Sequence, residues 1–561
     1  MQNKHGSWFF NNKTRLRLRA MAGEEGGNTM PNYDDLLKVL EENLKQPRNI
    51  IDGKYADTRK KTTIINPLDG TPMYTQPDTQ VGEIQPFLDS LKKCPKSGLH
   101  NPLKNIERYV MLGRVCFLAA AALSDAKVQK YFAMLIQSVM PKSYKQALGE
   151  VLVVLEFLKN FCGDQVRFLA TGKMTPGDHF GQQPQDYPWP FGPVVIIAPF
   201  NFPLEIVILQ LMGALFMGNK PLVKSATTVA VVLDQFMVLL HHCGLPKEDV
   251  DVIHCSGSVM NELLKQGKNT IRLVQFTGSS KVAEEISQIM RGKVRIEDAG
   301  FDWKILGPDF KAINLYHVAW QCDQDAYAAS GQKCSATSIL FAHKAWVECH
   351  LFHYLKELAS ERKLGNLTVG PALTWTTEQM IAHKNKLLQI PGSKLLFGGN
   401  PLVGHSIPAC YGAIEPTAVF VPLKQILSEK YWDIATTEVF GPFQVITTYC
   451  ENGMTSSGYT DELNLVLEAC ERMENHLTAA VVSDDPVFIN RVLGATVNGT
   501  TYAGIRARTT GAPQNHWFGP CGDPRGAGIG TPQAIINTWS SPRCIIRDVG
   551  PIDYSVKLVQ S

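Results

Sequence analysis

The chain has 561 residues, of which 44% are hydrophobic and 19% charged, and its net charge is only +3. This composition excludes a wholly disordered chain, and the small charge excludes a protein that coats nucleic acid. The 13 cysteines contain no Cys-x-x-Cys pair, which argues against a zinc ribbon and favours a reducing compartment.

The first 30 residues are predicted to be a tail outside the folded body. Residues 1–23 contain five basic residues and no acidic one, which leaves 50 basic and 52 acidic residues in the rest of the chain. An arginine-rich start without acids is typical of an organellar transit peptide. A disordered tail or an expression remnant is an equal alternative. We therefore expect residues 1–30 to be a disordered tail or a targeting remnant.

Residues 33–170 show mainly helical periodicity. Apolar residues recur at helical spacing over 33–44, 81–92, 106–123 and 143–168. Residues 171–192 are rich in glycine and proline and predict a hairpin or connector. The most apolar stretch, 194–217, is interrupted by polar residues and prolines, so we expect a buried strand, loop and helix, with no membrane insertion.

From residue 193 onward, strands and helices alternate. Short apolar runs predict strands at 194–198, 221–224, 250–255, 273–277 and 294–297. Helical runs occupy 204–217, 230–243, 261–266 and 281–290. This alternation predicts a parallel doubly wound sheet, which binds ligands at the carboxyl ends of its strands. A second α/β region extends to about 531, and 544–547 resembles a strand.

Two motifs suggest acyl chemistry. Cys334 lies in a polar turn after a helical stretch at 324–330, and the adjacent Lys333 supplies the positive charge that favours a nucleophilic thiol. Most cysteines are small core residues, so each of the 13 starts with roughly one chance in 13 of being the nucleophile. The Asn201 amide could donate to an oxyanion, or could simply cap the next helix.

Two further motifs suit a ligand that carries phosphate. Residues 276–280 join a strand to a helix, where hydroxyl and N–H groups can bind phosphate, although an ordinary serine cap is commoner. Lys224 ends a strand and could contact a ribose or phosphate, or be solvated.

Two other patterns carry little weight. The glycine run 526–530 lacks the spacing of a dinucleotide fingerprint. Histidines and a cysteine at 349–353 give a weak metal signal on a probable helix, so no metal site is expected.

Taken together and in order, these segments resemble the aldehyde dehydrogenase superfamily, as does Thr437–Pro442. The resemblance extends more weakly over about 35–545. Within the superfamily, the chain is similar to the delta-1-pyrroline-5-carboxylate dehydrogenases, especially their plant branch. That likeness is carried by Gln332–Ser335, Arg508–Gly511, His516–Gly519, Trp539–Pro542 and the segments 292–309 and 499–519.

The resemblance implies an α/β fold with three parts. We expect a Rossmann-type nucleotide-binding domain over 31–171 and 193–300, and an α/β catalytic domain over 301–534. A bridging β element over 172–192 and 535–561 is expected to pair its hairpin with the C-terminal strand. Relatives assemble through that element, so a homodimer or homotetramer is expected.

The resemblance also implies roles for three catalytic residues. Cys334 would attack the aldehyde, and the Asn201 amide with the Cys334 N–H would hold the oxyanion. Glu297 would activate the water that hydrolyses the resulting thioester. The usual turn around this base is altered here, because Glu297 lies 37 residues before Cys334 and not about 34. Asp298 is therefore the alternative base.

The implied cofactor is NAD. Residues lining its path would be Ile197, Ala198, Pro199 and Phe200, with Lys224 at the adenosine ribose. The pyrophosphate would meet Thr277, Gly278 and Ser279, while Glu438 and Phe440 would hold the nicotinamide end. Thr227 stands where NAD-preferring relatives often have an acid, which weakens the exclusion of NADP.

The implied substrate is glutamate γ-semialdehyde, which carries an α-carboxylate and an α-ammonium. Thr510 and Gly511 match the relatives' carboxylate-anchoring turn, with Ser335 and Phe518 beside the chain of the substrate. Glu156 corresponds to an acid proposed to meet the ammonium, although a solvated helical acid is an equal interpretation.

We therefore expect an NAD-dependent enzyme of proline catabolism in the mitochondrial matrix that acts on a small molecule and produces glutamate. Another semialdehyde dehydrogenase, such as one for succinate semialdehyde, is the nearest alternative. A catalytically silent binding protein on the same fold is the second.

Overall fold

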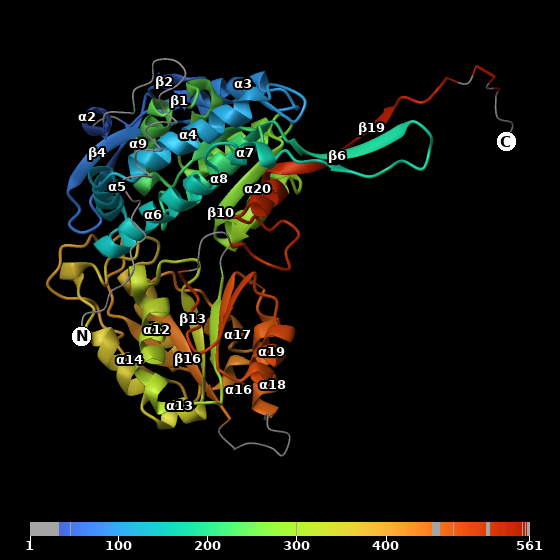
Figure 1. Cartoon of the computed structure of the whole chain (residues 1–561). Coiled ribbons are helices and arrows are strands. Elements are labelled where there is room, and N and C mark those ends of the chain that lie inside the picture. The colour runs from blue at the N-terminus through green and yellow to red at the C-terminus, as the bar shows by residue number, and fades with distance from the viewer. Residues whose placement is uncertain are drawn as a thin grey trace, which may run out of the picture.

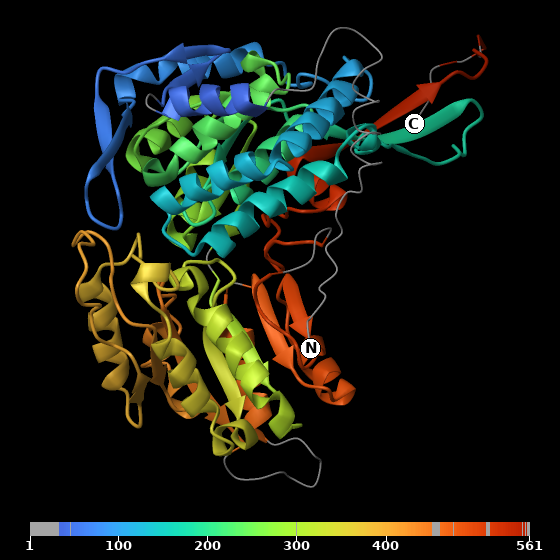
Figure 2. The same ribbon diagram turned by 60° about the vertical axis from the view of Figure 1, so that its left-hand side comes forward.

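The computed structural model describes residues 33–44, 47–298, 300–450, 461–474, 476–511, 516–552, 554–555 and 557. The segment 1–30, expected to be a tail or targeting remnant, lies outside these residues. Figures 1 and 2 show two lobes, one above the other, and an arm that projects from the upper lobe.

The upper lobe is built on a seven-stranded sheet with the order β11-β10-β7-β8-β9-β1-β2. Its parallel strands are β7 (Pro193–Ile197), β8 (Lys220–Lys224), β9 (Asp251–Val252), β10 (Leu273–Gly278) and β11 (Val294–Asp298). The N-terminal strands β1 (Asn49–Ile51) and β2 (Lys54–Ala56) extend the sheet in antiparallel fashion. Strand β7 is buried along its whole length, as expected for a parallel strand covered on both faces.

Helices cover this sheet on both faces. They are α2 (Tyr33–Leu44), α3 (Gln85–Lys93), α4 (Glu107–Leu123), α5 (Ala126–Val139), α6 (Tyr144–Asn160), α7 (Gln165–Phe168), α8 (Glu205–Phe216), α9 (Val231–His242), α10 (Gly257–Gly267) and α11 (Ser280–Met290). All residues of α8 after Glu205 are buried, which explains why the sequence there is apolar on every side. The predicted buried strand, loop and helix over 194–217 are thus confirmed as β7 and α8.

Several parts of the upper lobe differ from expectation. Strand β9 is shorter than the strand expected at 250–255, and α10 begins four residues before the expected start at 261. The helical run 143–168 is broken between α6 and α7, where Gly163 has φ +62° and its carbonyl oxygen lies 1.8 Å from the place a side chain on Gly113 would take. The close approach of α4 to this turn is possible because Gly113 has no side chain. A hairpin of β3 (Lys61–Ile65) and β4 (Pro72–Pro77) was not predicted, since its strands are short and mostly polar.

The lower lobe contains a second seven-stranded sheet, β14-β15-β16-β13-β12-β17-β18. Its strands are β12 (Asp302–Leu306), β13 (Thr337–His343), β14 (Lys394–Phe397), β15 (Thr417–Phe420), β16 (Phe443–Tyr449), β17 (Thr478–Val482) and β18 (Thr500–Ala503). All neighbouring pairs are parallel except β14 with β15.

Two hydrophobic cores flank this second sheet. One contains α12 (Leu315–Tyr327), α13 (Lys344–Glu348) and α14 (Leu351–Ser360). The other contains α15 (Thr377–Leu388), α16 (Leu423–Ile426), α17 (Trp432–Ala435), α18 (Asp461–Arg472) and α19 (Pro486–Gly494). Figure 1 shows α12 and α14 on one side of the sheet and α17, α18 and α19 on the other.

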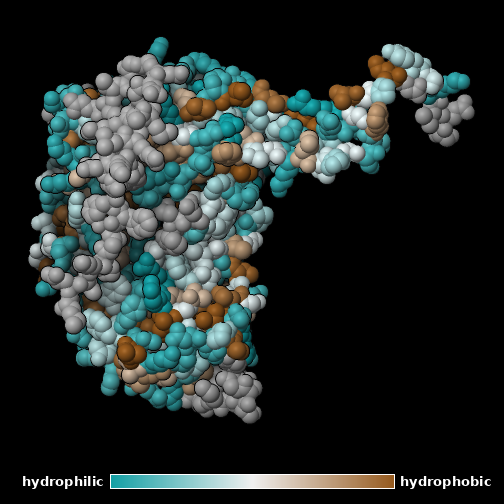
Figure 3. All heavy atoms as spheres, in the orientation of Figure 1, coloured by the Kyte–Doolittle hydropathy of each residue, from teal (hydrophilic) through white to brown (hydrophobic). Residues whose placement is uncertain are grey.

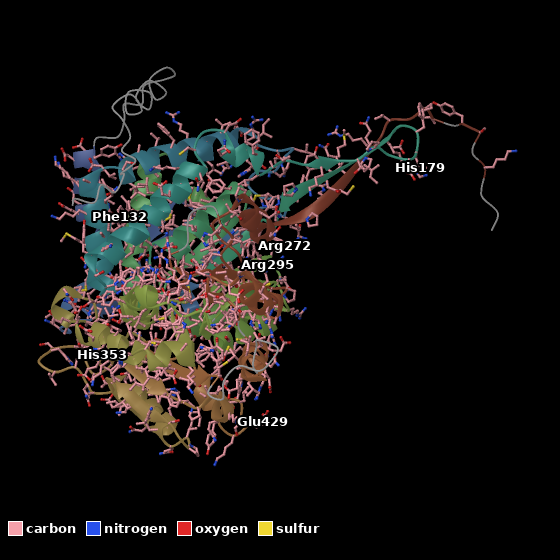
Figure 4. The ribbon with its side chains drawn as sticks, turned by 60° about the horizontal axis from the view of Figure 1, so that its bottom comes forward. Phe132, His179, Arg272, Arg295, His353 and Glu429 are labelled. Atoms are coloured by element: carbon pink, nitrogen blue, oxygen red, sulfur yellow. The ribbon has the colours of Figure 1, made fainter. Side chains whose placement is uncertain are left out.

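The arm joins segments that are far apart in the sequence. Strand β6 (Gln182–Pro190) pairs antiparallel with β19 (Ser540–Asp548) along its whole length, and β5 (Lys173–Met174) adds to the other edge. The expected pairing of the hairpin with the C-terminal strand is therefore present. Figure 4 shows His179 at the outer end of the arm.

The chain returns to the upper lobe earlier than the expected limit of 534. Gly526 already bridges to Ile296 of β11, and α20 (Pro532–Trp539) packs on α8, where Trp539 Nε1 donates to Gln210 at 3.0 Å. The expected boundary at 535 cuts α20, because the buried Trp539 belongs to the core of the upper lobe and strand pairing starts only at Ser540.

Among the described residues, no single helix is long and apolar enough to cross a membrane. Helices α4 and α5 satisfy the length and composition criteria only when taken together, and they meet at 87°.

Candidate active site

The carboxyl ends of four neighbouring strands meet at one edge of the upper sheet. The register pairs Ile197 with Lys224 on one side and with Phe276 on the other, and it pairs Thr277 with Glu297. Residues expected to bind the cofactor and the expected base are thus brought to the edge where such sheets bind ligands.

A tight left-handed turn presents Cys334. Helix α12 ends at Tyr327, and Ala329, Ser330 and Gly331 then have φ values of 55°, 57° and 68°. The expected helical stretch at 324–330 therefore ends early. Side chains rarely adopt this conformation, and its use by consecutive residues indicates a turn fixed by its surroundings.

Two contacts hold the turn in place. A side chain on Gly331 would lie 2.0 Å from the carbonyl oxygen of Gly441, so glycine is required for this loop to meet the segment 437–442. The fully buried Gln332 donates to the Pro371 carbonyl at 2.9 Å and accepts from the Leu373 N–H at 2.7 Å.

Cys334 faces the buried carboxyl group of Glu297. Glu297 is 1% exposed, and neither of its oxygens has a partner with full hydrogen-bond geometry among the described residues. Burial raises the pKa of Glu297 to about 7, and the interaction with the Cys334 thiol partly offsets that rise. Burial and the nearby Glu297 together raise the pKa of Cys334 well above its ordinary value. The thiol is therefore protonated at neutral pH, beside a carboxyl that titrates there.

Asp298 has different neighbours. Burial raises the pKa of Asp298, while the Ser280 side chain, at the start of α11, lowers it in part. Successive side chains of a strand point to opposite faces, so Asp298 cannot share the orientation of Glu297. Of the two acids, only Glu297 has an interaction with the Cys334 thiol.

A buried ion pair supports the loop that contains Asn201. Lys142 Nζ lies 2.7 Å from Glu150 Oε2 and donates to the Asn201 carbonyl at 3.0 Å. Glu150 Oε1 accepts from the N–H groups of Leu204 and Glu205 at 2.7 and 3.1 Å. The side-chain amide of Asn201 itself has no hydrogen-bond partner in the part of the chain that the structure describes. It is free to donate to a ligand.

Aromatic rings connect the two lobes beside this loop. The rings of Phe200 and Phe440 pack edge to face with centroids 5.7 Å apart. Burial, together with Asp302 and Asp298, raises the pKa of the nearby Glu438 well above its ordinary value. The upper and lower lobes therefore both contribute to one site.

A cationic loop lies on the other side of Cys334. Burial lowers the pKa of Lys333 to about 8, with Asp325 opposing the shift and Arg362 and Arg508 adding to it. The backbone N–H groups of Thr510 and Gly511 have no partner among the residues described. This side of the site can therefore receive an anion.

The sequence model of the aldehyde dehydrogenase family matches residues 55–520. The chain belongs to the aldehyde dehydrogenase family. It is 56% identical over 515 residues to "Delta-1-pyrroline-5-carboxylate dehydrogenase 12A1, mitochondrial" of Arabidopsis thaliana, covering 92% of this chain and 90% of that relative. The predicted family is thereby confirmed.

Solved structures confirm the predicted fold. A betaine aldehyde dehydrogenase of Staphylococcus aureus in complex with NAD+ has a TM-score of 0.76 at 16% identity, covering 93% of this chain and all of that one. An NADP-dependent glyceraldehyde-3-phosphate dehydrogenase of Bacillus halodurans with NADP has a TM-score of 0.73 at 20% identity, covering 90% of this chain and all of that one.

The upper lobe of this aldehyde dehydrogenase offers groups that fit a pyridine nucleotide. Lys224 is 8% exposed, and its ammonium contacts only the Ser225 carbonyl at 3.2 Å among the described residues, so it lacks a carboxylate partner. The Ser225 hydroxyl beside it is buried and unsatisfied. Ser279 precedes the 11-residue helix α11, yet its hydroxyl makes no capping bond. The ammonium of Lys224 and the hydroxyl groups of Ser225 and Ser279 are therefore available to bind a ribose and a phosphate.

Two of the residues expected to bind the substrate, Glu156 and Phe518, make their contacts with other parts of the upper lobe. Glu156 is half exposed and pairs with Lys159 at 2.7 Å, one turn further along α6. Phe518 is partly buried against the upper core and bridges to Ile529. Ser335, by contrast, is buried directly beside Cys334.

Sequence reasoning missed the residues that support the site. Lys142, Glu150 and Asp325 carry no motif, and their partners are distant in sequence. A signal existed for Glu150, because an acid inside an otherwise apolar helical run is rarely buried unless it is paired. No group of three or more metal-binding side chains occurs among the described residues, and the left-handed His350 separates α13 from α14.

Proposed function

We propose that this aldehyde dehydrogenase oxidises L-glutamate γ-semialdehyde, which forms from delta-1-pyrroline-5-carboxylate, to L-glutamate in proline catabolism. The observation that carries this proposal is the 56% identity, over nine-tenths of both chains, to a plant enzyme named for that activity. Fold alone would not justify it, since the family fold serves many aldehydes.

The proposed chemistry uses three residues of the site. Cys334, once deprotonated, attacks the aldehyde carbon, and the Asn201 amide with the Cys334 N–H holds the developing oxyanion. Oxidation leaves a thioester on Cys334. Glu297 then removes a proton from the water that hydrolyses this thioester and releases glutamate. We assign the base to Glu297 over Asp298 because Glu297 is the acid that interacts with the thiol.

We propose NAD as the cofactor, which supplies the hydride acceptor when bound. Lys224 would contact the adenosine ribose, and the end of β10 with Ser279 would face the pyrophosphate. Ile197 to Phe200 would line the path to Glu438 and Phe440 at the nicotinamide end. The segment 225–229 contains no second cation for the 2′-phosphate of NADP, which supports NAD although Thr227 is not acidic.

The substrate's α-carboxylate would bind on the cationic side of Cys334. The free N–H groups of Thr510 and Gly511 and the ammonium of Lys333 are suited to that anion. Ser335 and Phe518 would border the substrate. Glu156 would meet the α-ammonium only if it gave up its pairing with Lys159.

We further propose a mitochondrial location and a homo-oligomeric assembly. The relative from Arabidopsis is named mitochondrial, and residues 1–23 here are basic and acid-free. The projecting arm exposes apolar side chains, which Figure 3 shows in brown along it, and these are suited to contact with another subunit. We propose 31–171, 193–300 and the segment from about 525 to 539 as one domain, the lower lobe as the other, and the arm of 172–192 with the segment from 540 onward as the bridging element.

A comparison of substrates tests the proposed function. The purified enzyme is assayed with NAD and either glutamate semialdehyde or succinate semialdehyde, which lacks the α-ammonium and carries its carboxylate one carbon closer to the aldehyde. We expect kcat/KM to be higher by about 100-fold or more for glutamate semialdehyde, because succinate semialdehyde loses the contacts of the ammonium and cannot place its carboxylate at the same donors. Equal values, or a preference for succinate semialdehyde, would reject the proposed substrate.

A further inference from the structure

A buried ion pair lies behind the cationic side of the site, and the mechanism above does not use it. Lys304 of β12 is fully buried and Asp325 of α12 is 1% exposed, with Lys304 Nζ 2.6 Å from Asp325 Oδ2. The desolvation of two such charges offsets much of their attraction, so a buried pair is weak evidence for a role in stability. Its other contacts indicate what it does.

Asp325 also binds the loop that is expected to anchor the substrate. Its Oδ2 accepts the Thr509 N–H at 2.8 Å, and its Oδ1 accepts the Thr510 hydroxyl at 3.1 Å. One carboxylate thus receives an ammonium, a backbone N–H and a hydroxyl. Because the Thr510 hydroxyl hydrogen is directed at Asp325, only the free backbone N–H groups of Thr510 and Gly511 remain to donate to a ligand.

The same contacts connect the loop to both flanks of the nucleophile. Asp325 lies in the last turn of α12, nine residues before Cys334. Thr337, three residues after Cys334, has its hydroxyl 3.1 Å from that of Thr509, which is completely buried. These contacts fix the position of the loop relative to the segment that contains Cys334.

The charge of Asp325 also acts on Lys333. Among the groups that influence Lys333, Asp325 is the strongest that raises its pKa, whereas burial, Arg362 and Arg508 lower it, and Cys334 raises it less. Removal of the negative charge at 325 therefore lowers the pKa of Lys333 below about 8. Less of this lysine would then be protonated at neutral and alkaline pH.

We propose that Asp325 is a positioning residue that selects carboxylated aldehydes. It holds Thr509 and Thr510 so that the free N–H groups of the loop and the ammonium of Lys333 converge on the substrate's carboxylate beside Cys334. This inference rests on the proposed function, because it presumes a substrate with a carboxylate.

The test compares Asp325→Asn with wild type on glutamate semialdehyde and on butanal, an aldehyde without a carboxylate, from pH 6.5 to 9. We expect KM for glutamate semialdehyde to rise about 10- to 100-fold, the size expected for lost charge-assisted hydrogen bonds. That rise should steepen with pH as Lys333 loses its proton. KM for butanal should stay within about threefold of wild type.

Asp323→Asn is the matched control. Asp323 lies on the same helix, is equally buried and pairs with Arg362, but it makes no contact with residues 508–511. It should not change the ratio of the two KM values. Thr510→Val, which removes only the hydroxyl that bonds Asp325, tests the same claim if Asp325→Asn does not fold, and it too should raise KM for the carboxylated substrate alone.

Equal effects on both substrates, or none, for Asp325→Asn and Thr510→Val would overturn the inference. If wild type ignores glutamate semialdehyde but prefers succinate semialdehyde to butanal, the proposed substrate is wrong, and the variants are judged on succinate semialdehyde. If wild type discriminates neither acid from butanal, both proposals are overturned.

Discussion

At the scale of single residues, the site depends on ionisable side chains that are buried away from water. Glu297 titrates near neutral pH because it is buried, and Cys334 is protonated for the same reason. The resemblance to the aldehyde dehydrogenase family was enough to select both residues from the sequence. The spacing could not distinguish Glu297 from Asp298, since that choice depends on which face of β11 meets the thiol. Nor could it identify Lys142, Glu150 or Asp325, whose partners come together only through the fold.

Substitution of Glu297 tests the proposed base. As pH falls through about 7, Glu297 takes up a proton and can no longer act as a base, so wild-type kcat should decline below pH 7. Glu297→Gln should lower kcat by about 10²- to 10⁴-fold, the range for loss of a general base, and should abolish this pH dependence. A burst of about one NADH per site should persist, because thioester hydrolysis is the step that is lost.

Asp298→Asn is the control for this measurement and should keep kcat within a few-fold of wild type. The assignment would be reversed if Asp298→Asn lost turnover and Glu297→Gln kept it. Stopped-flow absorbance at 340 nm distinguishes the burst from the steady state.

At the scale of elements, the sequence predicted the alternating strands and helices of the upper lobe well. Apolar runs bounded by turn residues identified β7, α8, β8, β10 and β11 to within about two residues, because their burial dictates their composition. Elements shaped by tertiary contact were missed or misplaced. The break after α6 and the left-handed turn before Cys334 both arise where one backbone approaches another closely, which no local pattern records.

Gly331→Ala tests whether that left-handed turn is required. The added methyl group would lie 2.0 Å from the Gly441 carbonyl oxygen in a strained conformation, so the free energy of unfolding should fall by about 1–3 kcal/mol. Activity should fall as well, since the turn positions Cys334. Gly365→Ala is the matched control, because a side chain there meets nothing within 4 Å, and it should be nearly neutral. Urea denaturation of the variants measures both effects, and equal stabilities would show that the turn is not constrained.

At the scale of the whole molecule, the net charge of +3 describes no functional surface. It arises from five basic residues in the first 23, over a nearly neutral remainder. The arm is the prominent feature instead. It projects from the upper lobe and exposes Phe180, Ile546 and Val549 at 88%, 59% and 73%. Such exposure is unusual for a monomer and agrees with the proposed contact between subunits.

Charged substitutions on the arm test the proposed assembly. Ile546→Asp combined with Val549→Asp should reduce the molar mass measured by light scattering after gel filtration, because a carboxylate would be costly to bury in a subunit contact. Val403→Asp is the control, since Val403 is 90% exposed on the lower lobe, and it should leave the mass unchanged. A wild-type enzyme that is already monomeric would refute the homo-oligomer.

We propose above that the protein oxidises glutamate semialdehyde with NAD through a covalent adduct on Cys334. The most direct measurement supplies delta-1-pyrroline-5-carboxylate and NAD to wild type and to Cys334→Ala, and quantifies NADH by absorbance and glutamate by mass spectrometry. Wild type should form NADH and glutamate in equal amounts, and Cys334→Ala should form neither. Unchanged NADH production by Cys334→Ala would contradict the thiol mechanism, and no NADH from wild type with any aldehyde would show that the protein is catalytically silent.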